Sequence, residues 1–198
     1  MNFLTNVLYW ISTGFLIPVI IFLILSFVWA LLMLGSFYGI YMQRLRFKNN
    51  MRTVMEKIRT KKVKQFNFLK ETYVEGGFRT AIKEASASGW HPVHSEKILA
   101  DFETAGEKEL EASRVLMRLG PMLGLMGTLI PMGPALVGLA AGDITSMALN
   151  MQVAFSTTVI GIFCGAAGFI TQLVKKRWFV EDVNNLQYIF DLATSETK

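Results

Sequence analysis

Two threonine hydroxyls, at Thr128 and Thr158, lie within long uncharged stretches of this 198-residue chain. Between Leu119 and Val174 the only charged residue is Asp143, and that stretch holds no histidine. A threonine hydroxyl can donate one hydrogen bond and accept others, but it does not carry a proton as an acid or base. The two hydroxyls could therefore hold water, or hydrogen-bond a carboxyl group that another chain supplies.

Each threonine belongs to a stripe of small residues at alternating spacings of four and three. The first stripe is Met117, Pro121, Gly124, Thr128, Pro131, Ala135, Gly138 and Gly142. The second is Met147, Met151, Ala154, Thr158, Gly161, Gly165, Gly168 and Gln172. Small residues let membrane helices approach closely, and a buried hydroxyl can bond to a carbonyl of the preceding turn. Spacing alone favours such packing and leaves open the other reading, a polar seam that faces water or another chain.

Two prolines support the polar reading. Pro131 and Pro134 lack the N–H groups that would bond the carbonyls of Gly127 and Ile130. In lipid such carbonyls need another partner or a water-lined cavity.

The composition indicates which elements must position these residues. Hydrophobic residues make up 52% of the chain and charged residues 18%, against about 25% charged in soluble domains. A membrane helix needs about 20 mostly apolar residues. Three segments meet this need, at about 18–41, 116–139 and 146–174. The sequence therefore predicts an all-α membrane protein with three transmembrane helices.

Charge placement predicts the orientation. The first 43 residues carry no charged side chain, and all 20 Lys and Arg residues lie in 44–118 or 175–198. Because cytoplasmic loops carry the excess of basic residues, we expect the N-terminus outside and the C-terminus in the cytoplasm. The expected domains are 1–43 with the first span, a helical cytoplasmic domain at 44–114, a channel domain at 115–174 and a cytoplasmic tail at 175–198.

Other chemistries are weakly supported. Cys164 is the only cysteine, which excludes an intrachain disulfide. His91 and His94 lack a third spaced ligand, so no metal is expected. Asp143 could attract cations, but it is better placed as the cap of the helix that follows. With no nucleotide-binding loop, catalytic carboxylate pair or Ser-His-Asp set, we expect neither an enzyme nor a cofactor.

The basic face of residues 44–70 is expected to be a solvated surface beside anionic lipid. Nucleic-acid binding is not expected from it. Membrane lipid is therefore the expected neighbour of this segment.

Two motifs resemble the MotA/TolQ/ExbB proton channel family. "GPMLGLMGTLIPM" (120–132) is similar to the second-last span of that family, with its G-L-x-G-T core. "AFSTTVIGIFCGAAGF" (154–169) is similar to the last span, where a threonine precedes a glycine by three residues. Three spans place the resemblance closest to the TolQ/ExbB branch. Val153 stands where the ExbB-type pattern has a glutamate, with Gln152 beside it, and the "PMGP" sequence is also unlike the family.

The resemblance implies a subunit of an ion-driven rotary motor in the cell inner membrane. Such subunits form a pentameric ring around two copies of a single-span ExbD/TolR-like partner, whose membrane aspartate carries the proton. The implied ion-pathway residues are Thr128, Thr158 and the adjoining Thr157. The spacing of small residues predicts a pore-lining or helix-packing seam at Gly124, Pro131, Ala135, Ala154, Gly161 and Gly165. Two alternatives remain open, namely a structural membrane scaffold without ion flow and a transporter subunit.

Overall fold

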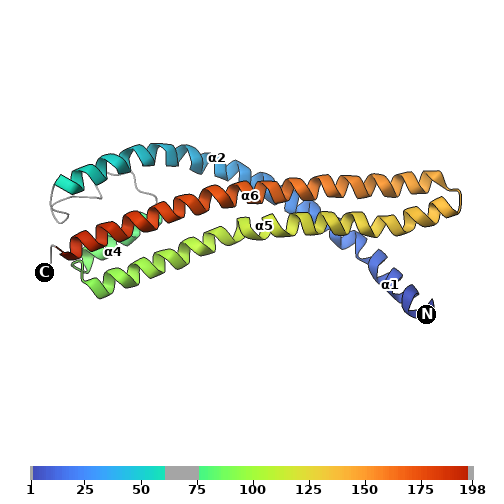
Figure 1. The fold of residues 1–198 in the computed structure, drawn as a ribbon, viewed down its shortest axis with the longest axis horizontal. Coiled ribbons are helices and arrows are strands. Elements are labelled where there is room, and N and C mark those ends of the chain that lie inside the picture. The colour runs from blue at the N-terminus through green and yellow to red at the C-terminus, as the bar shows by residue number, and fades with distance from the viewer. Residues whose placement is uncertain (1, 61–75, 196–198) are drawn as a thin grey trace. The chain divides into compact units, whose positions relative to one another are not determined.

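The computed structural model describes residues 2–60 and 76–195, which are helical and contain no strand. The helices are α1 (Asn2–Gly14), α2 (Leu16–Thr60), α4 (Gly76–Ala87), α5 (Pro92–Ala140) and α6 (Ile144–Ser195) (Figure 1). Three stretches are long and apolar enough to cross a membrane, one in α1–α2, one in α5 and one in α6. The predicted all-α class with three candidate spans is confirmed. The part of the expected cytoplasmic domain at 61–75 lies outside the described residues.

The chain divides into two compact units. The first, called the apolar unit, consists of Met1–Gly35 and Ala112–Gln172. The second, called the charged unit, consists of Ser36–Glu111 and Leu173–Lys198. All charged residues except Arg114, Arg118 and Asp143 belong to the charged unit. The two units therefore fold under different physical constraints, and each is described by itself.

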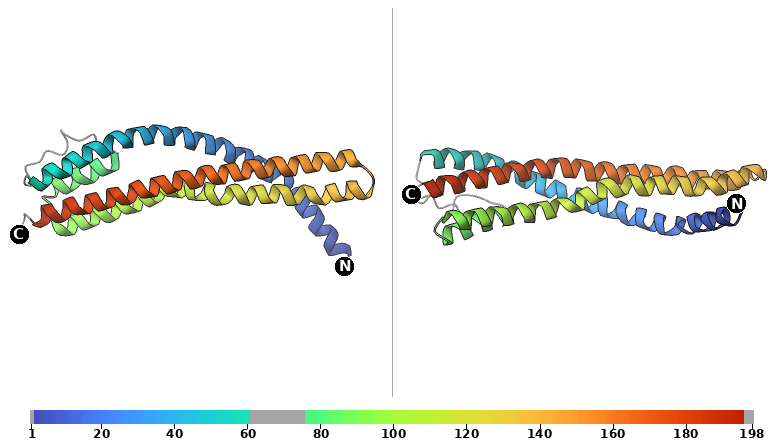
Figure 2. Two further views of the ribbon diagram at one scale, coloured as in Figure 1. Left: turned by 45° about the horizontal axis from the view of Figure 1, so that its top comes forward. Right: turned by 60° about the horizontal axis from the view of Figure 1, so that its bottom comes forward.

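In the apolar unit, α5 and α6 form an antiparallel hairpin, seen in Figure 1 and in two further views in Figure 2. The chain reverses through Gly142, whose φ of 74° suits glycine. Asp143 then accepts a hydrogen bond from the Ser146 backbone N–H at 3.0 Å. This bond satisfies a free N–H of the first turn of α6. The predicted role of Asp143 as a helix cap is confirmed.

Helix α2 packs against one side of this hairpin. Ala30 and Met33 of α2 join a buried cluster with Leu116, Cys164 and Ala167. The outward faces of the hairpin instead expose large apolar side chains. Examples with more than half of their surface exposed are Leu125, Leu129, Leu136, Val137, Phe155, Val159 and Ile162. Apolar surface of this extent is expected of a protein that lies in lipid or contacts other chains.

The charged unit has a core of its own, formed by α4 and the C-terminal part of α6. Its largest buried side chains include Phe78, Ile82 and Phe190. The turn between α4 and α5 places Trp90 at a φ of 60°, which is costly for a residue with a side chain. The Trp90 ring is buried and packs edge-on against Phe190, with centroids 6.2 Å apart. Burial of this ring offsets the backbone strain.

Candidate ion-pathway site

The glycines of α5 and α6 bring the two backbones into direct contact. A Cβ on Gly161 would lie 2.7 Å from the Gly124 Cα and 2.7 Å from the Gly120 carbonyl oxygen. A Cβ on Gly168 would lie 2.5 Å from the Met117 nitrogen. Real Cβ atoms do not approach backbone this closely, so these positions accept only glycine. At these positions the α5 and α6 backbones of one chain are therefore in direct contact.

Six seam residues were predicted from the stripes, and all six are buried. They are Gly124, Pro131, Ala135, Ala154, Gly161 and Gly165. α5 stays helical through Pro121, Pro131 and Pro134. Three of them lie in the contact between α5 and α6, since a Cβ on Gly124 or Gly161 would meet backbone of the other helix and a Cβ on Gly165 would meet the Pro121 ring. The structure thus shows close packing of the hairpin at these three glycines.

One contact between α5 and α6 lies one residue away from the predicted stripes. Gly127 of α5 faces Thr157 of α6, and a Cβ on Gly127 would lie 2.6 Å from the Thr157 hydroxyl oxygen. Thr157 is 5% exposed. Thr128 and Thr158 are the next residues along each helix and are half-buried. Small residues occupy two adjacent rows of each helix, so both the predicted stripes, at Gly124 and Gly161, and the neighbouring row, at Gly127 and Thr157, take part in the contact.

Thr128 and Thr158 lie on the same side of the hairpin. Thr128 directly follows Gly127, and Thr158 directly follows Thr157, the two residues that face each other. Successive residues of a helix are rotated by about 100° around its axis. Because α5 and α6 run antiparallel, these two rotations lead to the same side. Gly124, one helical turn before Thr128, also lies near Thr158, since a Cβ there would lie 3.6 Å from the Thr158 Cα.

The helix α2 occupies the other side of the hairpin. The residues of α6 that pack with α2 are Cys164 and Ala167, together with the nearby Ile160. Around the helix axis they are rotated from Thr157 in the direction opposite to Thr158. The side that carries Thr128 and Thr158 is therefore not covered by α2.

All three threonine hydroxyls donate to backbone carbonyls of their own helix. Thr128 donates to Leu125 at 2.7 Å, and Thr158 donates to Ala154 at 3.0 Å. Thr157 lies within hydrogen-bonding distance of two carbonyls, including that of Ala154 at 2.9 Å. Since a hydroxyl has one hydrogen, Thr128 and Thr158 offer oxygen lone pairs to a further group. In this arrangement they can accept a hydrogen bond from a water molecule or from a protonated carboxylic acid.

A polar contact that the sequence did not predict joins α5 and α6 near Gly168. Ser113 of α5 donates a hydrogen bond to the Gln172 side-chain carbonyl of α6 at 2.5 Å. The Thr171 hydroxyl beside it is buried without a hydrogen-bond partner among the described residues. Gln172 lay on the predicted stripe, but nothing in the spacing identified Ser113 as its partner. The contact between them is a consequence of the helix pairing.

In the charged unit, Arg44 and Asp182 form a bidentate ion pair that sequence reasoning also missed. Arg44 Nη1 donates to Asp182 Oδ1 at 2.7 Å, and Nη2 donates to the other carboxylate oxygen. Burial raises the pKa of Asp182, and the hydrogen bond from Arg44 acts against this rise. The two residues are 138 positions apart, so no local pattern could pair them. The Arg44 guanidinium also lies 5.7 Å from the centre of the Trp178 ring.

The two histidines lie at the N-terminal end of α5. The His91 and His94 rings are 5.6 Å apart, and both residues are exposed. Within the described residues, no group of three or more potential metal ligands is present.

Fold and site together define an α-helical membrane protein whose close-packed hairpin presents two hydroxyls on one side. Comparison with known families identifies the group to which it belongs. The sequence matches the MotA/TolQ/ExbB proton channel family over residues 50–187, which include α5, both threonines and most of α6. The chain belongs to this family, and its general role is in an ion channel of the membrane. No curated protein and no solved structure matches the chain.

Proposed function

We propose that the chain is the proton-channel subunit of an ion-driven membrane motor. Five copies would form a ring around two copies of a single-span ExbD/TolR-like partner. The observation that carries the proposal is the placement of Thr128 and Thr158 on one side of a hairpin, away from α2. Membership of the MotA/TolQ/ExbB proton channel family supports the same role.

The chemistry of these hydroxyls suits a partner carboxyl group that takes up and releases protons. Neither spanning part of α5 nor that of α6 holds a titratable acid or base of its own between Leu119 and Ala140 or between Ile144 and Val174, Cys164 excepted. The proton carrier must therefore come from another chain. A protonated carboxylic acid donates its hydrogen to a threonine oxygen, so these oxygens favour the neutral acid in a membrane, where a bare charge is costly.

The glycine contacts between α5 and α6 support a proton path that lies outside the single hairpin. Because the α5 and α6 backbones touch, protons would pass along the threonine side of the hairpin, with the opposite wall supplied by the partner. Each proton that crosses releases about 2.3 kcal/mol per 100 mV of membrane potential. In a rotary mechanism, that energy would turn the ring against the enclosed partner.

The proposed topology follows from the basic residues. Arg44 follows the first span, Arg114 and Arg118 precede the second, and Lys175 follows the third. The positive-inside rule then places the N-terminus outside the cell inner membrane and the C-terminus in the cytoplasm. A cysteine introduced at Asn2 should react with an impermeant thiol reagent in intact cells, whereas one at Thr197 should not.

Proton flux through the assembled complex tests the proposal. The chain is copurified with its partner, reconstituted into vesicles, and assayed with a pH-sensitive dye under an imposed potential. Thr128→Val and Thr158→Val should each abolish the flux, because valine keeps the shape and removes the oxygen. Ser156→Ala is the matched control, since Ser156 donates the same kind of backbone hydrogen bond, to the Gln152 carbonyl at 2.8 Å, from another face of α6.

Undiminished flux in the Thr128→Val/Thr158→Val double variant would overturn these roles. Absence of flux in the parent complex would favour the alternative, a structural scaffold whose glycines serve only packing. The number of subunits, measured by native mass spectrometry, tests the ring separately. A count other than five would refute the pentamer.

A further inference from the structure

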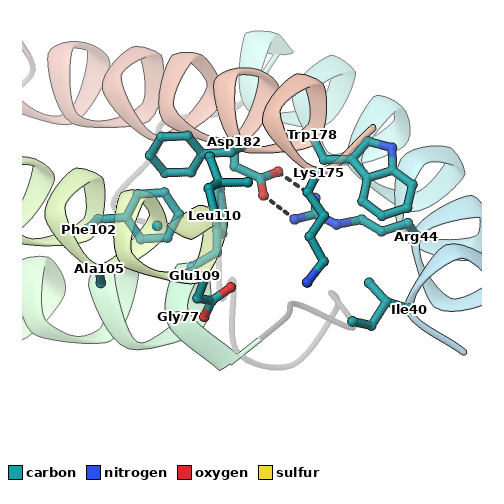
Figure 3. A pocket seen from close by; sticks show the side chains of 13 residues that line it. Ile40, Arg44, Gly77, Phe102, Ala105, Glu109, Leu110, Lys175, Trp178 and Asp182 are labelled. Carbon is teal, nitrogen blue, oxygen red and sulfur yellow. Dashed lines mark hydrogen bonds and ion pairs between the residues drawn. The ribbon is translucent and has the colours of Figure 1, made fainter. Parts of the chain in front are cut away.

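A pocket of about 320 Å³ in the charged unit has no role in the proposed ion path. Helices α2, α4, α5 and α6 all contribute to its walls (Figure 3). The walls are largely apolar and include Ile40, Phe78, Phe102, Leu110, Trp178 and Phe179. The volume falls within the range of about 300–1,000 Å³ that is common for sites of small molecules.

Four charged side chains line this pocket, and two of them neutralise each other. Arg44 and Asp182 are paired, as described above. The other two are Lys175 on α6 and Glu109 on α5, whose side chains are drawn among the pocket-lining residues in Figure 3. Neither Lys175 nor Glu109 makes a hydrogen bond or ion pair with a described residue. Among the described residues, the pocket thus has one unpaired ammonium group, one unpaired carboxylate and an apolar wall.

The position of these residues along the chain indicates where the pocket lies. Ile40 and Arg44 stand at the end of the first apolar span, and Lys175 is the first charged residue after the third. Two further bases, Lys176 and Arg177, follow directly. With the proposed topology, the pocket lies at the cytoplasmic edge of the bilayer. Basic sites between helices at this level are suited to lipid headgroups.

We propose that this pocket binds the headgroup of a phospholipid that carries both a phosphate and a primary ammonium group. The Lys175 ammonium would bind the phosphate, and the Glu109 carboxylate would bind the headgroup ammonium. The apolar wall would contact the glycerol and the first carbons of the acyl chains. Glu109 disfavours a purely anionic headgroup, because like charges repel. The inference goes beyond the proposed channel function and uses only its membrane topology.

Lipid retention by the purified oligomer tests this proposal. The oligomer is delipidated in detergent and titrated with phosphatidylethanolamine, phosphatidylcholine or phosphatidylglycerol, and native mass spectrometry counts the bound lipids. Phosphatidylethanolamine should bind about tenfold more tightly than phosphatidylcholine, whose quaternary ammonium cannot donate a hydrogen bond, since one charge-assisted bond is worth about 1.5–3 kcal/mol. Lys175→Gln should lower the affinity for phosphatidylethanolamine by about tenfold.

Two further variants make the result specific. Lys176→Gln is the matched control, because Lys176 is the exposed neighbour of Lys175 and does not line the pocket. It should leave the affinity unchanged. Glu109→Gln should weaken phosphatidylethanolamine binding and leave phosphatidylglycerol binding unaltered or stronger.

Three results would overturn the proposal. They are equal affinity for phosphatidylethanolamine and phosphatidylcholine, tighter binding of phosphatidylglycerol than of phosphatidylethanolamine, and equal losses in Lys175→Gln and Lys176→Gln. The second would indicate a site for anionic lipid, and the third would indicate general attraction of lipid to a basic surface. Thermal unfolding followed by circular dichroism should be the same for every variant. A lower melting temperature in Lys175→Gln would mean that Lys175 has a structural role instead.

Discussion

The apolar unit and the charged unit are held together by opposite means. In the apolar unit the tightest contacts are between glycine backbones, such as those of Gly124 and Gly161. In the charged unit they are between large side chains, such as Trp90 against Phe190, and across the Arg44–Asp182 pair. The difference follows from the solvent. Lipid tails are as apolar as leucine, so burying large side chains gains little there and close backbone packing decides the contact. Where water competes, burial of aromatic rings stabilises the fold.

The largest effect is expected from a side chain placed in the glycine contact. Gly161→Leu should destabilise the apolar unit by more than about 4 kcal/mol, since its side chain would collide with backbone on α5. The measurement is unfolding in mixed detergent, followed by circular dichroism. Gly35→Leu is the control, because nothing lies within 4 Å of a Cβ at Gly35. A folded Gly161→Leu protein of parental stability would show that α5 and α6 do not touch as described.

The buried ion pair of the charged unit should respond differently to single and double changes. Asp182→Ala should lower the free energy of unfolding by about 3 kcal/mol, because it leaves the Arg44 charge buried without its carboxylate. The double change Arg44→Met with Asp182→Leu should restore most of the loss, since two apolar side chains can fill the same space. Denaturant unfolding of all three proteins checks this. If the double variant were as unstable as the single one, the pair would be needed for more than charge balance.

A smaller effect is expected where a glycine of α5 faces a ring instead of backbone. A Cβ on Gly106 would collide with the Phe179 ring, and both residues belong to the charged unit. Gly106→Ala should cost about 1–2 kcal/mol, because the ring can shift where a backbone cannot. Adding Phe179→Leu should relieve the collision and recover part of the melting temperature. If Gly106→Ala lowered the free energy of unfolding as much as Gly161→Leu does, the proposed contrast between the two units would be wrong.

The smallest effect on stability is expected at the threonines that are proposed to line the proton path. Thr158→Val should change the free energy of unfolding by no more than about 0.5 kcal/mol, because it is half-buried and its hydroxyl bonds only to its own helix. Proton flux should nevertheless be lost. Measuring both quantities on one preparation separates a functional hydroxyl from a structural one. A large loss of stability would assign Thr158 to packing.

Local pattern was sufficient for much of the fold. The three apolar segments, the turn between α5 and α6 and the Asp143 cap could all be predicted, because each depends on residues close together in the chain. The small residues of both stripes were also evident from their spacing. The conformation of the Gly89–Trp90 turn could not be predicted from local pattern. The left-handed conformation of Trp90 is stabilised by the ring of Phe190, which is distant in the sequence.

The sequence by itself determined that the chain is a helical membrane protein with hydroxyls, and no charges, in its last two apolar helices. Helical periodicity and the cost of charge in lipid are enough for that conclusion. Only the tertiary structure decided that two adjacent rows of small residues take part in the contact, with Gly127 opposite Thr157 and with Thr128 and Thr158 half-buried beside it. It also decided the Arg44–Asp182 pair and the pocket beside it. These features depend on how helices distant in sequence approach one another, and periodicity within one helix does not specify that approach.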